Sequence, residues 1–502
     1  MKYNFFNNLL VLDLANNHFG DINHAKKIVS DFSKIIKKKK LKATIKFQFR
    51  NLETFIHKDY INSDEKYVKR FLSTKLSNDN FKNLYSHIKK NNLLTSCTPF
   101  DEKSVDLIEK MKFDIIKIAS VSSIDFNLLE RVSRNKIPKI ISTGGKSLEE
   151  IDKIVSFFKK KKQIFALMHC VAIYPSENET LQISFIKNLI QRYGNVPIGW
   201  STHEKPNEFL PAALAYASGA RIFEKHIGIN SKKYKLNDYS ITPEVFDKWH
   251  DHLENSIKIL GDGNKFIPKK ETETLNTLQR GVYIKKDIKK NSILSKNNYY
   301  FAFPLQKNQI SSADLKKNTI IVKDKKKDSI IKIEDVLFDK ELIHEYKIRS
   351  YIHELKAILN YNKISIQDTF DMEISHHKGL NKFRETGAFL FNIINKKIYA
   401  KKMLVMLPNQ SHPLHFHKKK DESFHVLSGT LISNLNGKKK VLYPGQILHI
   451  NKNSWHKFKA GVNGCIFDEI STTSFSDDSF YKDKKIKKLT RDTRKTFIKN
   501  WF

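Results

Sequence analysis

The stretch GARIFEKHIG, residues 219–228, has the composition of a buried strand that ends on Glu224, Lys225 and His226. Ile222 and the phenylalanine after it suit a hydrophobic core. Three ionisable groups in succession do not, because burying them is costly unless each is paired or coordinated. The stretch therefore predicts a polar site at the end of a core strand.

Seven comparable apolar runs precede this one, and amphipathic segments separate them. Strands that alternate with helices in this way predict an α/β fold, a (β/α)8 TIM barrel over residues 1–265. A doubly wound open sheet is the alternative, but no glycine-rich dinucleotide turn follows the first run. The apolar runs are 9–15, 42–49, 92–97, 113–120, 137–143, 163–170, 195–202 and 220–226.

Polar side chains follow the predicted strands, and in such a barrel the carboxyl ends of the strands open onto one mouth. Lysines with serine hydroxyls can hold a phosphate or carboxylate. His203 and His226, on neighbouring strands, can jointly bind a divalent cation, with Glu224 and Lys225 in the surrounding polar shell. Each residue alone is more often a hydrogen-bonded structural group. The polar residues are Asn17, His18, Lys46, Gln48, Lys117, Ser120, Ser142, Thr143, His169, Tyr174, Ser201, His203 and His226.

Two further segments differ in character from the barrel. In residues 275–340 the stretch KDIKKNSILSKNNY (286–299) is echoed by KDKKKDSIIKIEDV (323–336), which predicts a small, loop-rich β unit. A helical linker is the alternative. Residues 345–502 contain short alternating strands with Pro/Gly turns, typical of an antiparallel β barrel.

The last segment contains HFHKKKDESFHVLSG (415–429) and YPGQILHINKNSWHKF (443–458). A His-x-His pair on one strand places both imidazoles on the same face. With Glu422 and His456, the pair His415 and His417 forms a candidate site for a divalent transition metal such as Mn, Fe or Zn. The pattern resembles the two cupin motifs, and residues 468–483 are similar to sugar-isomerase-like cupins. The remaining histidines, expected at the surface or beside the ligands, are His412, His425 and His449.

The barrel segment also resembles a known family. The motifs LANNHFGD, IKFQ, TPFDEKSV, KIAS, STGG, HCVAIYP, GWSTH and FEKHIG occur in the order seen in sialic-acid (N-acetylneuraminate, nonulosonic acid) synthases. LGDGNK (260–265) follows, and residues 275–340 resemble the antifreeze-like (SAF) domain of those enzymes.

The resemblance implies a C–C bond-forming transferase that condenses phosphoenolpyruvate with an N-acyl amino sugar similar to N-acetylmannosamine, giving a nonulosonic acid and phosphate. It implies Mn or Mg at His203 and His226. It also implies a domain-swapped homodimer, with Arg280 as a candidate for the arginine that enters the partner's barrel. The implied phosphoenolpyruvate contacts are Lys46, Lys117, Ser120, Ser142 and Ser201, and the implied catalytic residues are Lys46, Gln48, Lys117 and Tyr174.

We expect the fused cupin to bind or isomerise a related sugar. In the barrel, several positions depart from the family pattern. Carboxylates that contact sugar hydroxyls govern specificity in buried sites, so their replacement bears on the acceptor. A carbohydrate-binding or assembly protein without turnover is the alternative. The departures are Asp13, Ala15, Ser122, Thr202, and Leu236 with Asn237.

The formal net charge is +37, yet the lysines are spread along the whole chain in short runs. This pattern favours solvated faces over a nucleic-acid site. The scattered Cys97, Cys170 and Cys465 predict neither a disulfide framework nor a cysteine-based zinc site. With no visible signal peptide or membrane span, we expect a cytoplasmic protein that binds no nucleic acid and no membrane.

Overall fold

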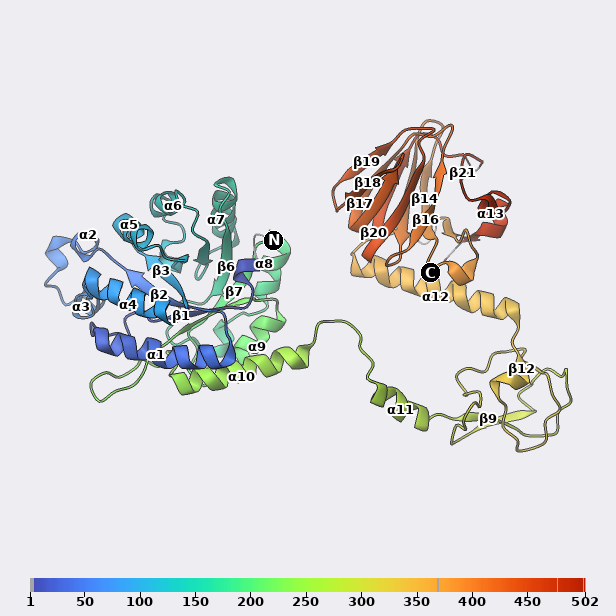
Figure 1. Cartoon of the computed structure of the whole chain (residues 1–502), viewed down its shortest axis with the longest axis horizontal. Coiled ribbons are helices and arrows are strands. Elements are labelled where there is room, and N and C mark those ends of the chain that lie inside the picture. The colour runs from blue at the N-terminus through green and yellow to red at the C-terminus, as the bar shows by residue number, and fades with distance from the viewer. Residues whose placement is uncertain (1–3, 368–369, 476, 500, 502) are drawn as a thin grey trace. The chain divides into compact units, whose positions relative to one another are not determined.

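The computed structural model describes residues 4–367, 370–475, 477–499 and 501. The chain divides into two compact units, Met1–Lys265 and Phe266–Phe502. In Figure 1 the first unit runs from blue to green and the second from green to red. None of the described helices combines the length and apolarity that crossing a bilayer requires.

The first unit is a closed parallel barrel in which β1 through β8 pair in chain order and β8 pairs with β1. This confirms the predicted TIM barrel and excludes the open sheet. The strands are β1 (Leu9–Asp13), β2 (Ala43–Phe49), β3 (Leu94–Pro99), β4 (Ile115–Ile118), β5 (Lys139–Ser142), β6 (Phe165–Cys170), β7 (Ile198–Ser201) and β8 (Ile222–His226).

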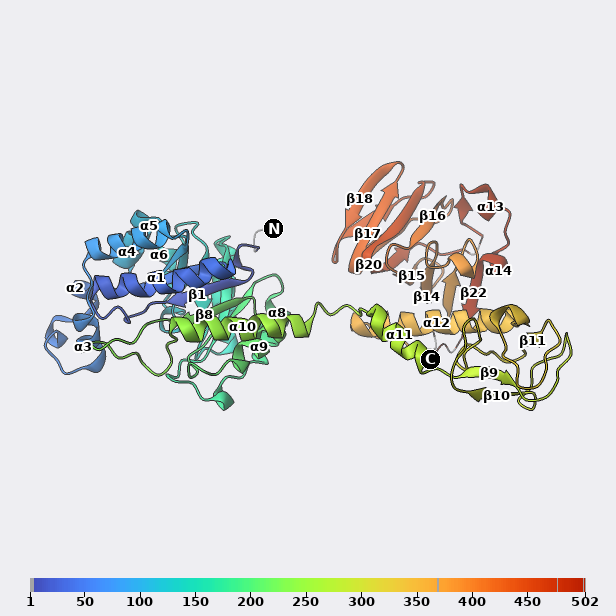
Figure 2. The ribbon, with the colours of Figure 1, turned by 60° about the horizontal axis from the view of Figure 1, so that its bottom comes forward.

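Helices surround the barrel (Figure 2), and all of them except the short α2 and α3 bury apolar residues. Side-chain caps define where several of them begin: Asp21 and Asp101 accept backbone N–H bonds at the starts of α1 and α5, and Ser147 with Glu150 forms a capping box on α7. The helices are α1 (Ile22–Lys39), α2 (Leu52–Phe55), α3 (Lys66–Ser73), α4 (Asn78–Lys90), α5 (Glu102–Met111), α6 (Phe126–Val132), α7 (Leu148–Lys160), α8 (Phe185–Tyr193), α9 (Leu210–Ala217) and α10 (Pro243–Leu260).

The barrel interior changes from apolar to polar along each strand. Leu9 and Val11 of β1 belong to a buried cluster together with Ile222 of β8. Two residues further along the same faces come Asp13 and Glu224, because side chains alternate along a strand. The apolar layers thus fill one end of the barrel, and the polar layer lies at the carboxyl ends of the strands.

The second unit begins with α11 (Lys269–Thr277) and a small β-rich segment. This segment contains β9 (Gly281–Ile284), β10 (Tyr299–Ala302), β11 (Ile320–Ile321) and β12 (Val336–Leu337). The sequence repeat has a structural counterpart. Asp324 accepts bonds from the backbone of Lys290 and the ammonium of Lys289, and Asp287 accepts matching bonds from Lys327 and Lys326. The segment is therefore a loop-rich β unit and not a helical linker, and its SAF identity stays a prediction.

After α12 (Lys340–Tyr361) the chain forms an antiparallel sheet in the order β18-β17-β20-β15-β14-β13-β22, with β16 on β20 and β19 on β17. This confirms the predicted β-rich cupin region. Its elements are β13 (Met372–Ser375), β14 (Ala388–Asn395), β15 (Ala400–Met406), β16 (Ser411–Phe416), β17 (Glu422–Leu435), β18 (Lys438–Leu442), β19 (Ile447–Ile450), β20 (His456–Ser471), β21 (Phe480–Tyr481), β22 (Lys495–Ile498), α13 (Lys484–Lys487) and α14 (Arg491–Arg494).

Candidate active site

Strand register brings three ionisable residues side by side at the barrel mouth. Asp13 is the register partner of Lys46 on β2 and of His226 on β8. The Asp13 carboxylate lies 2.9 Å from the Lys46 ammonium and 3.4 Å from Nδ1 of His226. All three side chains are buried.

The Glu224 carboxylate joins the two predicted lysines. Its Oε1 lies 2.7 Å from Nζ of Lys46, and its Oε2 lies 3.0 Å from Nζ of Lys117. Lys117 in turn donates a 2.7 Å hydrogen bond to Oγ of Ser142 on the neighbouring strand. Two ammonium groups are therefore balanced by the carboxylates of Glu224 and Asp13.

Burial and the charged partners shift the pKa values of these groups in opposite directions. Burial opposes the charged form of Lys46, but Asp13 and Glu224 outweigh it and raise the pKa of Lys46. For Lys117 burial dominates the attraction of Glu224, and the pKa of Lys117 is lowered. Burial would raise the pKa of Glu224, yet both lysines hold it below its usual range. The Lys46–Glu224 pair therefore remains ionised at neutral pH.

The predicted serines lie at the carboxyl ends of β5 and β7 and directly after β4. Ser142 and Ser201 are buried, and Oγ of Ser120 accepts a 3.0 Å bond from the backbone of Gly144. A side chain at Gly144 would begin only 2.8 Å from that Oγ, so glycine permits this close approach. The structure thus brings Lys117 to Ser142 and holds Ser120 against the turn that follows β5.

The two predicted metal ligands lie next to each other, with ring centroids 5.2 Å apart. Nδ1 of His203 bonds the carbonyl of Val171 at 2.9 Å, which leaves Nε2 with its lone pair. Burial, with the neighbouring His226, lowers the pKa of His203 to about 3, and burial also lowers the pKa of His226. Nδ1 of His226 is buried without a hydrogen-bond partner among the described residues. Two neutral imidazoles beside the Asp13 carboxylate fit a divalent cation.

Aromatic rings and an amide complete this mouth. The ring of Tyr174 lies 4.0 Å from that of His203, and Tyr239 lies 5.2 Å from His226. Gln48 donates a 3.2 Å bond to Asp13. Two other predicted mouth residues, Asn17 and His169, make structural contacts. Asn17 donates to Ile227 and Ser240 and accepts from Asn237, and Nε2 of His169 bonds the carbonyl of Leu181.

The expectation that Lys225 lies in the polar shell around the metal is wrong. Lys225 stands between Glu224 and His226 on β8, so alternation directs it to the opposite face of the strand. There it forms a buried ion pair with Glu204. Glu224 does face the mouth, but it pairs with the two lysines.

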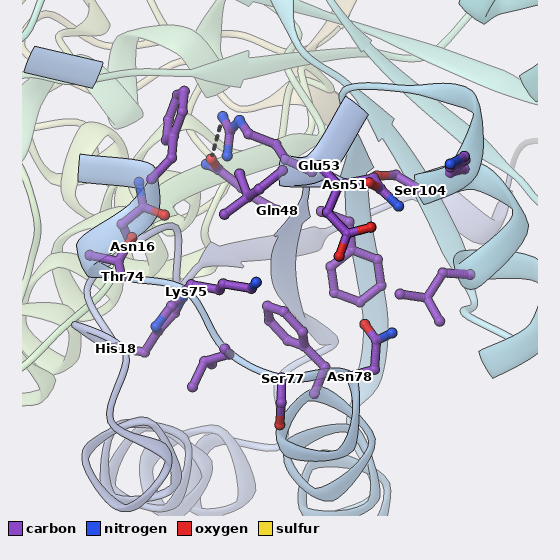
Figure 3. A pocket seen from close by; sticks show the side chains of 18 residues that line it. Asn16, His18, Gln48, Asn51, Glu53, Thr74, Lys75, Ser77, Asn78 and Ser104 are labelled. Carbon is purple, nitrogen blue, oxygen red and sulfur yellow. Dashed lines mark hydrogen bonds between the residues drawn. The ribbon is translucent and has the colours of Figure 1, made fainter. Parts of the chain in front are cut away.

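A pocket adjoins the mouth where β1 and β2 end, and Figure 3 shows the side chains that line it. It has a volume of about 320 Å³. Gln48, His18 and Asn16 border it, and Lys75 extends into its interior. Arg50, directly after β2, also lines it and was not among the predicted site residues. The alternation in KFQFR, which places Lys46, Gln48 and Arg50 on one face, is the signal that could have found it.

The cupin region brings its predicted ligands together. Nitrogen atoms of His415, His417 and His456 lie within 4.8 Å of one another, and all three side chains are buried. Nδ1 of His415 bonds the carbonyl of Pro413 at 2.9 Å, and Nδ1 of His456 bonds that of Ser454 at 3.0 Å. His417 makes the same type of bond to Asp478. Each ring therefore has Nε2 available as a ligand atom.

The predicted fourth ligand, Glu422, lies in the same cluster. Its Oε1 is 2.9 Å from Nε2 of His456 and its Oε2 is 3.7 Å from Nε2 of His417. Lys420 lies 2.6 Å from Glu422 and 2.7 Å from Glu469. Burial opposes ionisation of Glu422, but Lys420 lowers its pKa well below the usual range. The site thus offers three imidazoles and one carboxylate, a donor set that suits a transition metal.

The other cupin histidines occupy different environments. His449 is exposed and bonds Ser423, as expected for a surface residue. His425 is half-buried. His412 is buried, and its Nε2 lies 3.1 Å from Nε2 of His377, a residue that sequence reasoning missed. The rings of His412 and His415 are 4.8 Å apart, so His412 lies beside the ligands.

Comparisons with known proteins match two parts of this chain to known families. Residues 35–265 match the NeuB family, and residues 402–463 match the Cupin domain family. An uncharacterized protein of Methanocaldococcus jannaschii is 31% identical over 64% of this chain and 93% of its own length. The N,N'-diacetyllegionaminic acid synthase of Campylobacter jejuni is 27% identical over 58% of this chain and 88% of its own length.

Among solved structures, a candidate spore coat polysaccharide biosynthesis protein E from Chromobacterium violaceum is similar to this chain. It has 37% sequence identity and a TM-score of 0.62, and the match covers 66% of this chain and 99% of the other.

Proposed function

We propose, because this chain belongs to the NeuB family, that its barrel condenses phosphoenolpyruvate with the open-chain aldehyde of an N-acyl amino sugar. Carbon 3 of the enol forms the new bond to the aldehyde carbon. Water adds to carbon 2, and the bond from carbon 2 to the phosphate oxygen breaks. The products are a nonulosonic acid and inorganic phosphate, as for a C–C bond-forming transferase.

Lys46, Lys117, Ser120, Ser142 and Ser201 would hold the phosphate and carboxylate of phosphoenolpyruvate. The 2.7 Å bond from Lys117 to Ser142 presents an ammonium and a hydroxyl at one point of the mouth. Gln48 and Tyr174 would position the acceptor beside the imidazoles. Because carboxylates balance both ammonium groups, binding a multivalent anion here requires further positive charge.

His203 and His226 would hold a divalent cation, Mn or Mg, with Asp13 close by. When bound, the cation supplies positive charge and polarises the aldehyde oxygen. The single observation that carries the proposal is a continuous set of contacts at one barrel mouth. Lys117 bonds Ser142 and pairs with Glu224, Glu224 pairs with Lys46, Lys46 pairs with Asp13, and Asp13 lies 3.4 Å from His226.

Phosphate release from phosphoenolpyruvate tests this function. The full chain with Mn²⁺ or Mg²⁺ is assayed with a panel of N-acyl amino sugars, and the product is identified by mass. We expect phosphate release only when acceptor and metal are both present. A barrel that binds these sugars and releases no phosphate would support the alternative, a carbohydrate-binding or assembly protein.

For the cupin we propose a transition-metal site, with Mn, Fe or Zn held by His415, His417 and His456, and Glu422 as the fourth ligand. The bonds from the Nδ1 atoms to backbone carbonyls support it, since they fix each ring with Nε2 free. The proposed role is to bind or isomerise a sugar related to the barrel's substrate or product. Metal analysis of the purified chain tests the site.

We also propose that residues 275–340 act as an SAF-like domain between a barrel of residues 1–265 and a cupin of residues 345–502. In the proposed domain-swapped homodimer this domain covers the partner's barrel. Light scattering of the full chain and of a variant lacking residues 275–340 tests the proposal, and we expect a dimer for the first and a monomer for the second.

A further inference from the structure

The pocket beside the barrel mouth has one wall made by Arg50. The faces of its guanidinium are occupied by aromatic rings, with the guanidinium carbon 3.6 Å from the ring centroid of Phe100 and 4.2 Å from that of Phe71. Stacking of this kind uses the faces of the group and leaves its N–H donors in the plane. The rings therefore fix the orientation of Arg50 without satisfying its hydrogen bonds.

The donors of Arg50 are poorly satisfied by the protein. Nη2 donates one 3.3 Å bond to Oε1 of Gln48. Nε is buried and has no hydrogen-bond partner, and no carboxylate forms an ion pair with Arg50, within the residues that the structure describes. Asp101, the acid in the adjacent loop, already accepts bonds from Asn51 and Ser104 at the start of α5. A partly buried cation whose donors are unpaired costs free energy unless a ligand accepts hydrogen bonds from those donors.

A chain of contacts links Arg50 to the candidate metal ligands. Asp13 lies 3.4 Å from His226, Gln48 donates to Asp13 at 3.2 Å, and Arg50 donates to Gln48. Arg50 thus lies beyond Gln48 as seen from the imidazoles. An acceptor whose aldehyde carbon lies at the imidazoles and whose chain passes Gln48 would place its far end against Arg50.

The charge of the pocket lining favours an anion at that end. Arg50 is accompanied by Lys75 and Lys103, against one carboxylate, Glu53. Burial lowers the pKa of Arg50 to about 10, so it stays charged at neutral pH. Burial lowers the pKa of His18 to about 4, so this imidazole adds no charge. The lining therefore has an excess of positive charge in a space of about 320 Å³.

We propose that the acceptor is an acidic amino sugar, with a phosphate ester or carboxylate at the end remote from its aldehyde, and that Arg50 and Lys75 bind this anionic group. This inference rests on the proposed condensation, which it deepens by naming the acceptor class. Arg50 is then a specificity-determining residue and not a catalytic one, because it contacts the remote end of the acceptor while the reacting carbon lies at the imidazoles.

The test compares three acceptors in the full-length, metal-loaded protein: N-acetylmannosamine, its 6-phosphate and the corresponding 6-carboxylate. We expect kcat/KM for one of the acidic acceptors to exceed that for the neutral sugar by about 10- to 100-fold. Arg50→Gln should remove this preference and leave the neutral sugar within about threefold. Arg50→Lys should retain more activity with the phosphate than with the carboxylate, because an ammonium replaces bidentate binding by a point charge.

Arg134→Gln, in an exposed turn before β5, is the matched control and should keep the preference. Circular dichroism of each variant checks that the barrel remains folded. Equal losses for neutral and acidic acceptors in Arg50→Gln would make Arg50 a structural residue. A raised KM for phosphoenolpyruvate alone would assign Arg50 to that substrate. A wild-type preference for the neutral sugar would also overturn the proposal.

Failure of the proposed function gives a different result, namely no phosphate release with any acceptor. Calorimetric titration with N-acetylmannosamine 6-phosphate and with N-acetylmannosamine then tests whether the pocket binds an anionic group. Tighter binding of the phosphate that is lost in Arg50→Gln supports the anion pocket without turnover. Equal binding of the two sugars, or none, refutes it.

Discussion

Nζ of Lys117 on β4 donates a 2.7 Å hydrogen bond to Oγ of Ser142 on β5, and both side chains are buried at the barrel mouth. Ser142→Ala removes the acceptor of this bond and a hydroxyl that would contact phosphate. We expect KM for phosphoenolpyruvate to rise about 10-fold, with a smaller change in kcat. Steady-state phosphate release measures it, and Ser156→Ala on the exposed face of α7 is the control. An unchanged KM would remove Ser142 from the anion site.

His226 lies beside His203 and 3.4 Å from Asp13. His226→Ala leaves His203 as the single imidazole of the proposed metal site. We expect carbon–carbon bond formation to fall by about 100-fold or more, while circular dichroism stays that of the folded barrel.

His353→Ala, exposed on α12, is the control for this substitution and should retain activity. Full turnover by His226→Ala would contradict the metal role. Partial recovery of His226→Ala at high Mn²⁺ concentration would show that metal affinity, and not folding, had been lost.

Lys139, at the start of β5, is buried and donates only to uncharged acceptors, among them Gln163 at 2.7 Å and the carbonyl of Asn135 at 2.8 Å. Burial, followed by repulsion from Lys136, lowers the pKa of Lys139 to about 7. Between pH 7 and 10 the unfolded chain holds a proton that the folded chain releases, so stability increases with pH over this range.

We expect this residue to add ~2–4 kcal/mol to the free energy of unfolding between pH 7 and pH 10. Urea unfolding of wild type and Lys139→Met at both pH values measures the difference, with Lys160→Met as an exposed control. The increase should be absent in Lys139→Met. An equal pH dependence in both proteins would show that Lys139 keeps its proton when folded.

His417 lies between Glu422 and the backbone of Asp478 in the cupin cluster. In the full chain, His417→Ala should lose one equivalent of bound transition metal, measured by plasma mass spectrometry, and leave phosphate release by the barrel unchanged. His449→Ala, at the exposed Ser423 contact, should retain the metal. Full metal occupancy in His417→Ala would contradict this ligand set.

Strand-end residues were predictable because a parallel barrel gathers the carboxyl ends of its strands at one mouth. Lys117, Ser142 and His226 meet there for this reason. The pairing of Glu224 with Lys46 and Lys117 was not predictable, since it depends on three side-chain conformations from different strands. The inward direction of Glu224 followed from alternation, and the same rule applied to Lys225 would have placed it outside.

Arg50 was missed for a related reason. Its unused donors follow from Asp101 being occupied at the start of α5, and its fixed orientation follows from Phe71 and Phe100, which are distant from it in sequence. The contact of His412 with His377 likewise joins residues near the ends of two different strands. Sequence periodicity predicts which face a residue occupies, whereas the partners across that face depend on tertiary packing.

The three cupin imidazoles are oriented by main-chain carbonyl groups, two of which belong to the residue two positions earlier in the chain. Such an anchor is independent of the side chains that surround it. The side chains around the three histidines can therefore be exchanged by mutation while the imidazole rings keep their orientation, which makes the module a scaffold whose surroundings can be redesigned separately from its histidine cluster.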